Sequence, residues 1–264
     1  MVPLRRKTLH YVWHWLWNTG CGDIGNQGPH ELDLLCWALG EPGFPRGVMS
    51  FGGRFAWHDS AQTPNTQFAV FDYGKIPVIF EVRDLADKRD ATEAAHMKGI
   101  RVGVLITCEG GEFRGGRNGG WVYDKDDKRM QQFPGDGGGT HGQNFIDAVR
   151  SRKSEGLHAK LEHAHVSSAL AHLANISYRL GRQARPEEVA EQVKSNANAA
   201  DALQRFSAQL AANDVDLAKT PWTLGHWLAI DPANEAFSAG PDVDKANAML
   251  TRPYRKPYVV PEQV

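Results

Sequence analysis

Alternating apolar and polar positions mark residues 45–135 as rich in β-strands. Val78, Phe80 and Val82, for example, alternate with Glu81 and Arg83. Such alternation is typical of antiparallel strands with one covered face. We therefore predict strands at 46–51, 66–74, 77–85 and 101–108, then a loop at 110–120 and a hairpin over 121–133.

A helical period flanks this region on both sides. Residues 30–40 form a short amphipathic pattern that ends at Gly40, and Thr140 can cap a helix that carries Phe145 and Val149. A second pattern runs over 160–181 and ends at a glycine, and 186–213 continue as a polar, alanine-rich helix. We expect the remaining tail, from Pro221, to lie over the body.

This order of elements predicts an α+β fold. We expect an open, mainly antiparallel sheet with helices packed on one face, plus a helical C-terminal tail. Residues 1–183 form the body and residues 184–264 the tail that packs on it.

Composition narrows the function classes. The 264 residues are 41% hydrophobic and 23% charged, as in ordinary globular domains, and 30 basic against 31 acidic residues give a net charge of −1. We therefore expect no nucleic-acid or membrane partner. The three cysteines lack C-x-x-C spacing, which argues against a disulfide framework or a cysteine-rich zinc site. The start does not have the pattern of a normal signal peptide, so the default compartment is the cytoplasm.

Two patterns suggest a cofactor or metal only weakly. Residues 137–142 match G-x-G-x-x-G, but no buried parallel strand precedes them, so a turn with a helix cap is favoured over a dinucleotide site. Four histidines lie between 158 and 172 without a carboxylate or cysteine at ligand spacing, which favours polar positions on a partly solvated helix; they are His158, His163, His165 and His172.

The glycine-rich segment before Pro29 is a stronger candidate. His30 and Asp33 would share one helix face, and if the turn before Pro29 is also helical, Asn26 and Asp23 precede His30 on it. A histidine beside a carboxylate can act as general acid or base. A capped helix start with a buried histidine explains the same residues, and the chemistry alone does not separate the two.

An aromatic run precedes this segment. Tyr11, Trp13, Trp15 and Trp17 alternate and would share one face of an extended chain. Indole rings stack on sugars and other flat ligands, and they also fill cores and subunit interfaces. Both roles stay open for these tryptophans.

Taken together, several segments resemble the C-terminal half of the Gfo/Idh/MocA family of nicotinamide-dependent oxidoreductases. They are WHWLWNTGCGDIGNQGPHELDLLCWALG, GGRFAWHDSAQTPNTQFAVFDYG with IFEVRDL, HGQNFIDAVRSRK, SSALAHLANISYRLGR and TRPYRKPYVVP. The resemblance extends over nearly the whole chain. It implies a substrate-binding and oligomerisation domain over residues 1–183.

The resemblance also implies roles for individual residues. The histidine of the family's D-x-x-x-H motif falls on His30, while its aspartate falls on Asn26, which cannot take a proton and can only orient a hydroxyl. Catalysis is then expected at His30 and Asp33, with Asp23 as the alternative carboxylate that could help His30. Substrate contacts are expected at Asn26, Asp23, Trp13, Trp15 and Trp17.

Part of the family pattern has no counterpart here. The family's N-terminal Rossmann domain and the lysine of its E-K-P motif are missing, so we expect no NAD or NADP to bind this chain alone, although one of them is implied for the intact enzyme. We expect half of an oxidoreductase that acts on a sugar, polyol or derivative and is incapable of catalysis alone. It would form homo-oligomers through the sheet face or join a separate Rossmann-domain chain. The alternatives are a non-catalytic dimerising module and part of an NAD-dependent glycosidase.

Overall fold

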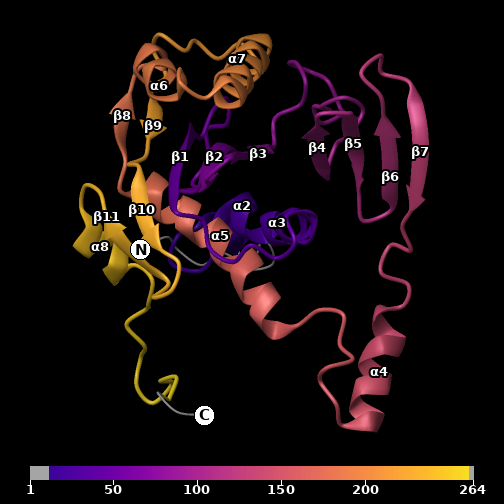
Figure 1. The fold of residues 1–264 in the computed structure, drawn as a ribbon. Coiled ribbons are helices and arrows are strands. Elements are labelled where there is room, and N and C mark those ends of the chain that lie inside the picture. The colour runs from indigo at the N-terminus through magenta and orange to yellow at the C-terminus, as the bar shows by residue number, and fades with distance from the viewer. Residues whose placement is uncertain (1–11, 262–264) are drawn as a thin grey trace.

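A computed structural model describes residues 12–261, so the prediction for Tyr11 lies outside the described residues (Figure 1). A seven-stranded sheet forms the centre, with the order β11-β10-β1-β2-β3 and with β9 and β8 attached beside β1. Its strands are β1 (Gly47–Gly53), β2 (Thr66–Tyr73), β3 (Ile76–Arg83), β8 (Arg182–Ala184), β9 (Trp222–Leu224), β10 (Leu228–Asp231) and β11 (Ala236–Ala239).

A second sheet has four strands in the order β4-β5-β6-β7. They are β4 (Val104–Cys108), β5 (Gly111–Gly116), β6 (Gly119–Tyr123) and β7 (Arg129–Pro134). The helices are η1 (Val12–Trp15), α2 (Gly22–Asn26), α3 (Gly28–Ala38), α4 (His141–Ser151), α5 (Leu161–Arg179), α6 (Pro186–Val193), α7 (Ala197–Ala212) and α8 (Val243–Ala248). Every pairing between described strands is antiparallel, which confirms the predicted α+β class.

Helices α3 and α5 cover one face of the central sheet. Leu32 and Cys36 of α3 pack with Leu170 of α5 against Ala69 and Phe71 of β2, all in one buried cluster. This layer is the expected packing of helices on a sheet face, and it fixes the position of α2 and α3.

The opposite face is covered by the helices of the tail, α6 and α7. Phe51 and Phe68 point to this side and are fully buried with Phe206 of α7 and Trp222 of β9. The phenylalanines of the central sheet are therefore covered within the chain.

The tail also contributes strands, which the sequence analysis did not predict. Strands β9 and β10 both pair with β1, and β11 extends the sheet beyond β10. The segment expected to be a loop at 110–120 contains all of β5 as well as the start of β6. Residues 12–15, expected to be extended, form the short 3-10 helix η1.

The part of the chain from β7 to the start of α5 is uncovered. All six residues of β7 are exposed, and α4 has no buried residue. Figure 1 shows α4 set apart from the central sheet, beyond the β4–β7 sheet. Within residues 12–261, none of the helices combines the length and the apolar composition that crossing a membrane requires.

Candidate functional site

Helices α2 and α3 bring Asn26 and His30 to the surface on successive turns. The turn before Pro29 is helical, as the motif required, because Gln27 has helical angles and its N–H donates to the Asp23 carbonyl at 2.9 Å. Asn26 and His30 are both exposed. An amide that is able to orient a hydroxyl and an imidazole that is able to exchange a proton thus lie four residues apart.

A carboxyl group that the sequence analysis missed lies beside them. Glu31 is only 7% exposed, and Gln27 Nε2 donates to its Oε2 at 3.0 Å. Burial raises the pKa of Glu31, an effect opposed by the bond from Gln27 and by the charge of His30. Buried carboxyls with a raised pKa are frequent at functional sites.

Asp33 faces helix α5 and joins the two helices. Its Oδ1 accepts a hydrogen bond of 2.8 Å from Ser167 Oγ, which also donates to the His163 carbonyl. Asp33 and His30 lie on one helix. The hydrogen bond between Ser167 and Asp33 therefore links α5 to α3.

Asp23, the second residue of α2, belongs to a hydrogen-bonded group with Trp15 and Asp84. Trp15 Nε1 donates to Asp23 Oδ2 at 2.6 Å, and the Asp84 carboxyl is hydrogen-bonded to Asp23. Burial, followed by the bond to Asp23 and the charge of Asp23, raises the pKa of Asp84 to about 9. With a pKa of about 9, the Asp84 carboxyl keeps its proton at neutral pH.

The other two tryptophans lie in different surroundings. Trp13 is 42% exposed and stacks on His14, with ring centroids 3.8 Å apart. Trp17 lies beside Tyr178 and under the guanidinium of Arg179. The three tryptophans do not form one common face.

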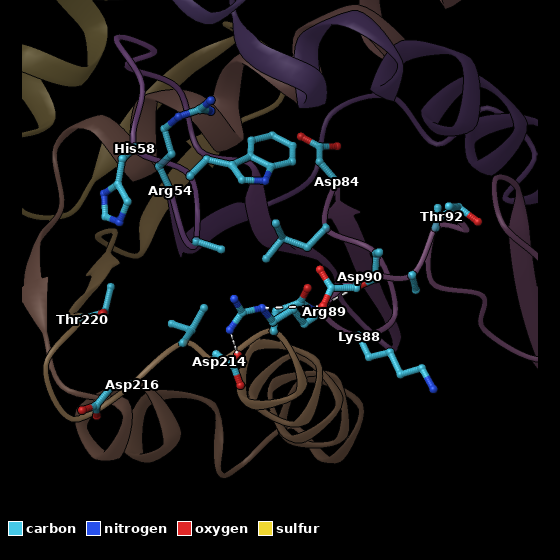
Figure 2. Close-up of a pocket in the computed structure, with 18 of the residues that line it drawn as sticks. Arg54, His58, Asp84, Lys88, Arg89, Asp90, Thr92, Asp214, Asp216 and Thr220 are labelled. Carbon is cyan, nitrogen blue, oxygen red and sulfur yellow. Dashed lines mark hydrogen bonds and ion pairs between the residues drawn. The ribbon is translucent and has the colours of Figure 1, made fainter.

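A hollow in the described part of the chain lies elsewhere. A cavity of about 980 Å³ opens between the loops at 54–58, 84–94 and 213–220 (Figure 2). Arg89 pairs with Asp214 on one side of it, and Asp84 is also one of its lining residues. None of the predicted site residues lines this cavity, although Asp23 contacts it indirectly through Asp84.

The remaining sequence candidates do not assemble into a site. The glycines at 137–142 follow β7, an exposed edge strand of an antiparallel sheet, and Thr140 Oγ1 donates to Asp136 instead of capping α4. His163 and His165 bond to separate carboxylates, Glu41 and Glu235. Within residues 12–261, no three histidine, cysteine or acidic residues gather in a metal-binding arrangement.

Comparison with known proteins gives only remote similarities. No family model and no curated protein matches the chain. One similar solved structure is a "putative oxidoreductase" from Klebsiella pneumoniae, with 15% identity and a TM-score of 0.39 over 56% of this chain and 45% of that chain. Another is the "probable oxidoreductase yhhX", with 11% identity and a TM-score of 0.35 over 57% of this chain and 47% of that chain. This chain spans less than half the length of either protein, and the similarities are too low to assign an activity.

Proposed function

We propose that this chain is the substrate-binding half of a nicotinamide-dependent oxidoreductase that acts on a sugar, polyol or derivative. The observation that carries the proposal is the exposed pair of Asn26 and His30, built on a nearly continuous helix beside the buried carboxyl of Glu31. The D-x-x-x-H-like spacing of the sequence supports the same assignment.

In this proposal His30 exchanges the proton of a substrate hydroxyl. The imidazole takes that proton while the carbon loses a hydride, and the Asn26 amide orients the hydroxyl by hydrogen bonding. Burial raises the pKa of Glu31, and the nearby His30 imidazole acts against this shift, so the two groups interact electrostatically. The nicotinamide, bound outside this chain, supplies the hydride acceptor.

The uncovered region between β7 and α5 supports the idea of a half-enzyme. Phe145, Ile146 and Val149 of α4 are 57%, 41% and 42% exposed, and Phe133 of β7 is 48% exposed. Apolar patches of this kind mark surfaces that another body covers. A Rossmann-type domain, on a separate chain or on further sequence, would fit this role.

A binding experiment tests the site. Saturation-transfer NMR with a panel of hexoses and linear polyols is expected to detect millimolar binding to the wild-type chain. His30→Ala is expected to abolish it, and His158→Ala, at an exposed histidine on a loop, to leave it unchanged. Absence of binding across the panel, or equal binding by His30→Ala, contradicts the proposal.

A second measurement tests whether the nicotinamide cofactor binds outside this chain. We expect no NAD or NADP binding by the 264-residue chain in isothermal titration. The described strands pair only in antiparallel fashion and so provide no βαβ unit for a dinucleotide. A micromolar affinity would contradict the assignment as half of an enzyme.

The apolar stripe on α4 also favours a second candidate function, a non-catalytic module that dimerises. Sedimentation of the wild-type chain is then expected to show a dimer, which Phe145→Ser weakens and Gln143→Ser, on another face of α4, does not. A wild-type chain that stays monomeric up to 100 μM, a concentration at which roughly micromolar dimers form, contradicts this second function.

A further inference from the structure

Two arginines from distant segments meet near the start of α2. Arg179 is the last residue of α5, and its guanidinium carbon lies 5.0 Å from the centre of the Trp17 ring. Arg252 follows α8 in the extended tail, and its Nη1 donates to the Asn18 carbonyl at 3.4 Å. Both arginines are exposed, so their donors are open to a ligand.

The two positive charges lie within electrostatic range of each other and of His172. Desolvation lowers the pKa of Arg179, and the charge of Arg252 lowers it further. The same two causes, in the same order, lower the pKa of His172 on α5. The contacts agree, because Arg179 lies over Trp17 and Arg252 donates to the carbonyl of the next residue, Asn18, so two cationic side chains reach the same short segment.

No carboxylate within residues 12–261 forms an ion pair with either arginine. Asp23, which lies a few residues after Trp17 and Asn18 in the chain, is already hydrogen-bonded to Trp15 and Asp84. The helix dipole at the C-terminus of α5 stabilises the positive charge of Arg179. Arg252 lies on no helix, so no helix dipole stabilises its charge. An anion placed between the two guanidinium groups would relieve their repulsion.

We propose that Arg179 and Arg252 bind an oxyanion carried by the substrate, so that the substrate is a sugar acid or a sugar phosphate. Guanidinium groups present paired N–H donors that match the oxygens of carboxylate and phosphate. The Trp17 ring, whose centre is 5.0 Å from the guanidinium carbon, positions Arg179 through a cation–π contact. This inference rests on the proposed function, because it assigns the substrate class of the same site.

The position of the arginines relative to His30 suits such a substrate. Burial raises the pKa of the Cys21 thiol, and the positive charge of Arg252 acts against this rise. Cys21 immediately precedes α2, and Asn26 is the last residue of α2. A helix of five residues is roughly 7.5 Å long at 1.5 Å per residue. In this proposal the substrate carries its anionic group at the Arg252 end of α2 and its reacting hydroxyl at the end that leads to His30.

The test compares charged and neutral ligands at low salt, where screening is weak. Isothermal titration in roughly 20 mM salt is expected to show a hexose 6-phosphate or a hexonate binding at least tenfold more tightly than the neutral hexose. Arg252→Gln is expected to remove this preference, and Arg179→Gln to weaken it in the same direction. Arg255→Gln, in the same tail but stacked on Tyr258, is the matched control and is expected to keep it.

The outcomes separate this inference from the proposed function. Equal affinity for charged and neutral ligands, or a charge preference that survives Arg252→Gln, overturns the oxyanion site. If neutral sugars bind and His30→Ala abolishes that binding, the proposed function stands even then. Conversely, a charge preference that depends on Arg252 while His30→Ala changes nothing supports the oxyanion site and contradicts the catalytic one. Circular dichroism of Arg252→Gln and Arg179→Gln confirms that both variants are folded.

Discussion

The carboxyl groups of Asp23 and Asp84 are hydrogen-bonded to each other, although one begins the candidate region and the other follows β3. Two carboxyls in contact cannot both ionise without strong repulsion. The charge of Arg54 acts against the raised pKa of Asp84 but does not offset burial and Asp23. The stability of the fold should therefore depend on this proton.

The first prediction is a stability that falls as the pH rises. An unfolded aspartate ionises near pH 4, whereas the pKa of Asp84 is raised to about 9, so the folded chain holds an extra proton between these values. The unfolding free energy should fall across that window, by at most about 1.4 kcal/mol per pH unit. Asp84→Asn should flatten the dependence, as measured by urea unfolding at pH 5, 6.5 and 8. Asp126→Asn, at an exposed turn, should leave the slope unchanged, and equal slopes for all three proteins would refute the shared proton.

A second prediction concerns the polar group that holds α5 to the sheet. Gln67 Nε2 donates to Asn175 Oδ1 at 3.1 Å, and Asn175 Nδ2 donates to the Cys21 carbonyl at 2.8 Å. Asn175→Ala leaves a buried donor and a carbonyl without these partners, so we expect a loss of about 1–3 kcal/mol of unfolding free energy. Asn198→Ala, at an exposed position of α7, should change it by less than about 0.5 kcal/mol. A loss of similar size in both variants would contradict the role of Asn175.

The strands with alternating side chains were predictable, but β5 was not. Its sequence is rich in glycine and gives no period of two, and it becomes a strand because β4 and β6 supply partners on both sides. Gly115 and Gly120 face each other in this pairing, where a Cβ on either would lie 2.7 Å from the Cα of the other. Their lack of side chains, which indicated a loop, is what permits the close approach.

The candidate site was predictable only where it depends on local spacing. Asn26 and His30 lie on one helical segment, so their relation could be predicted from the sequence. Asp84 had no local signal, because its raised pKa depends on a partner from α2 and on burial by the fold. The proximity of Arg179 to Arg252 likewise arises only when the tail passes the end of α5.

A third prediction separates the covered face of the sheet from the uncovered helix. Phe206 is fully buried and meets Phe68 edge-on, with ring centroids 5.7 Å apart. Phe206→Ala should lower the unfolding free energy by about 3–5 kcal/mol, because it opens a cavity between α7 and the sheet. Phe145→Ala, at an exposed position, should change it by less than about 0.5 kcal/mol at low micromolar protein, where roughly micromolar dimers begin to dissociate. Equal losses would mean that α7 is not part of the folded core.

The last prediction concerns the ion pair that fastens α7 to β3. Arg205 donates to both carboxylate oxygens of Glu81, at 2.6 and 3.0 Å. Although burial acts to lower it, the bonds to Glu81 and Asp201 raise the pKa of Arg205. The Glu81 side chain is only 16% exposed, so solvent screens this pair less than a surface pair.

A double-mutant cycle measures this coupling directly. Glu81→Gln and Arg205→Gln should each destabilise the fold, and the double variant should lose less than their sum, by roughly 1–2 kcal/mol. The matched cycle is Lys194→Gln with Glu191→Gln, an exposed pair on the surface that should couple by at most about 0.5 kcal/mol. Raising the salt concentration should weaken the surface coupling more than the Arg205 coupling, because Glu81 is shielded from solvent. Additive losses at Glu81 and Arg205 would show that apolar packing alone holds α7 on this face of the sheet.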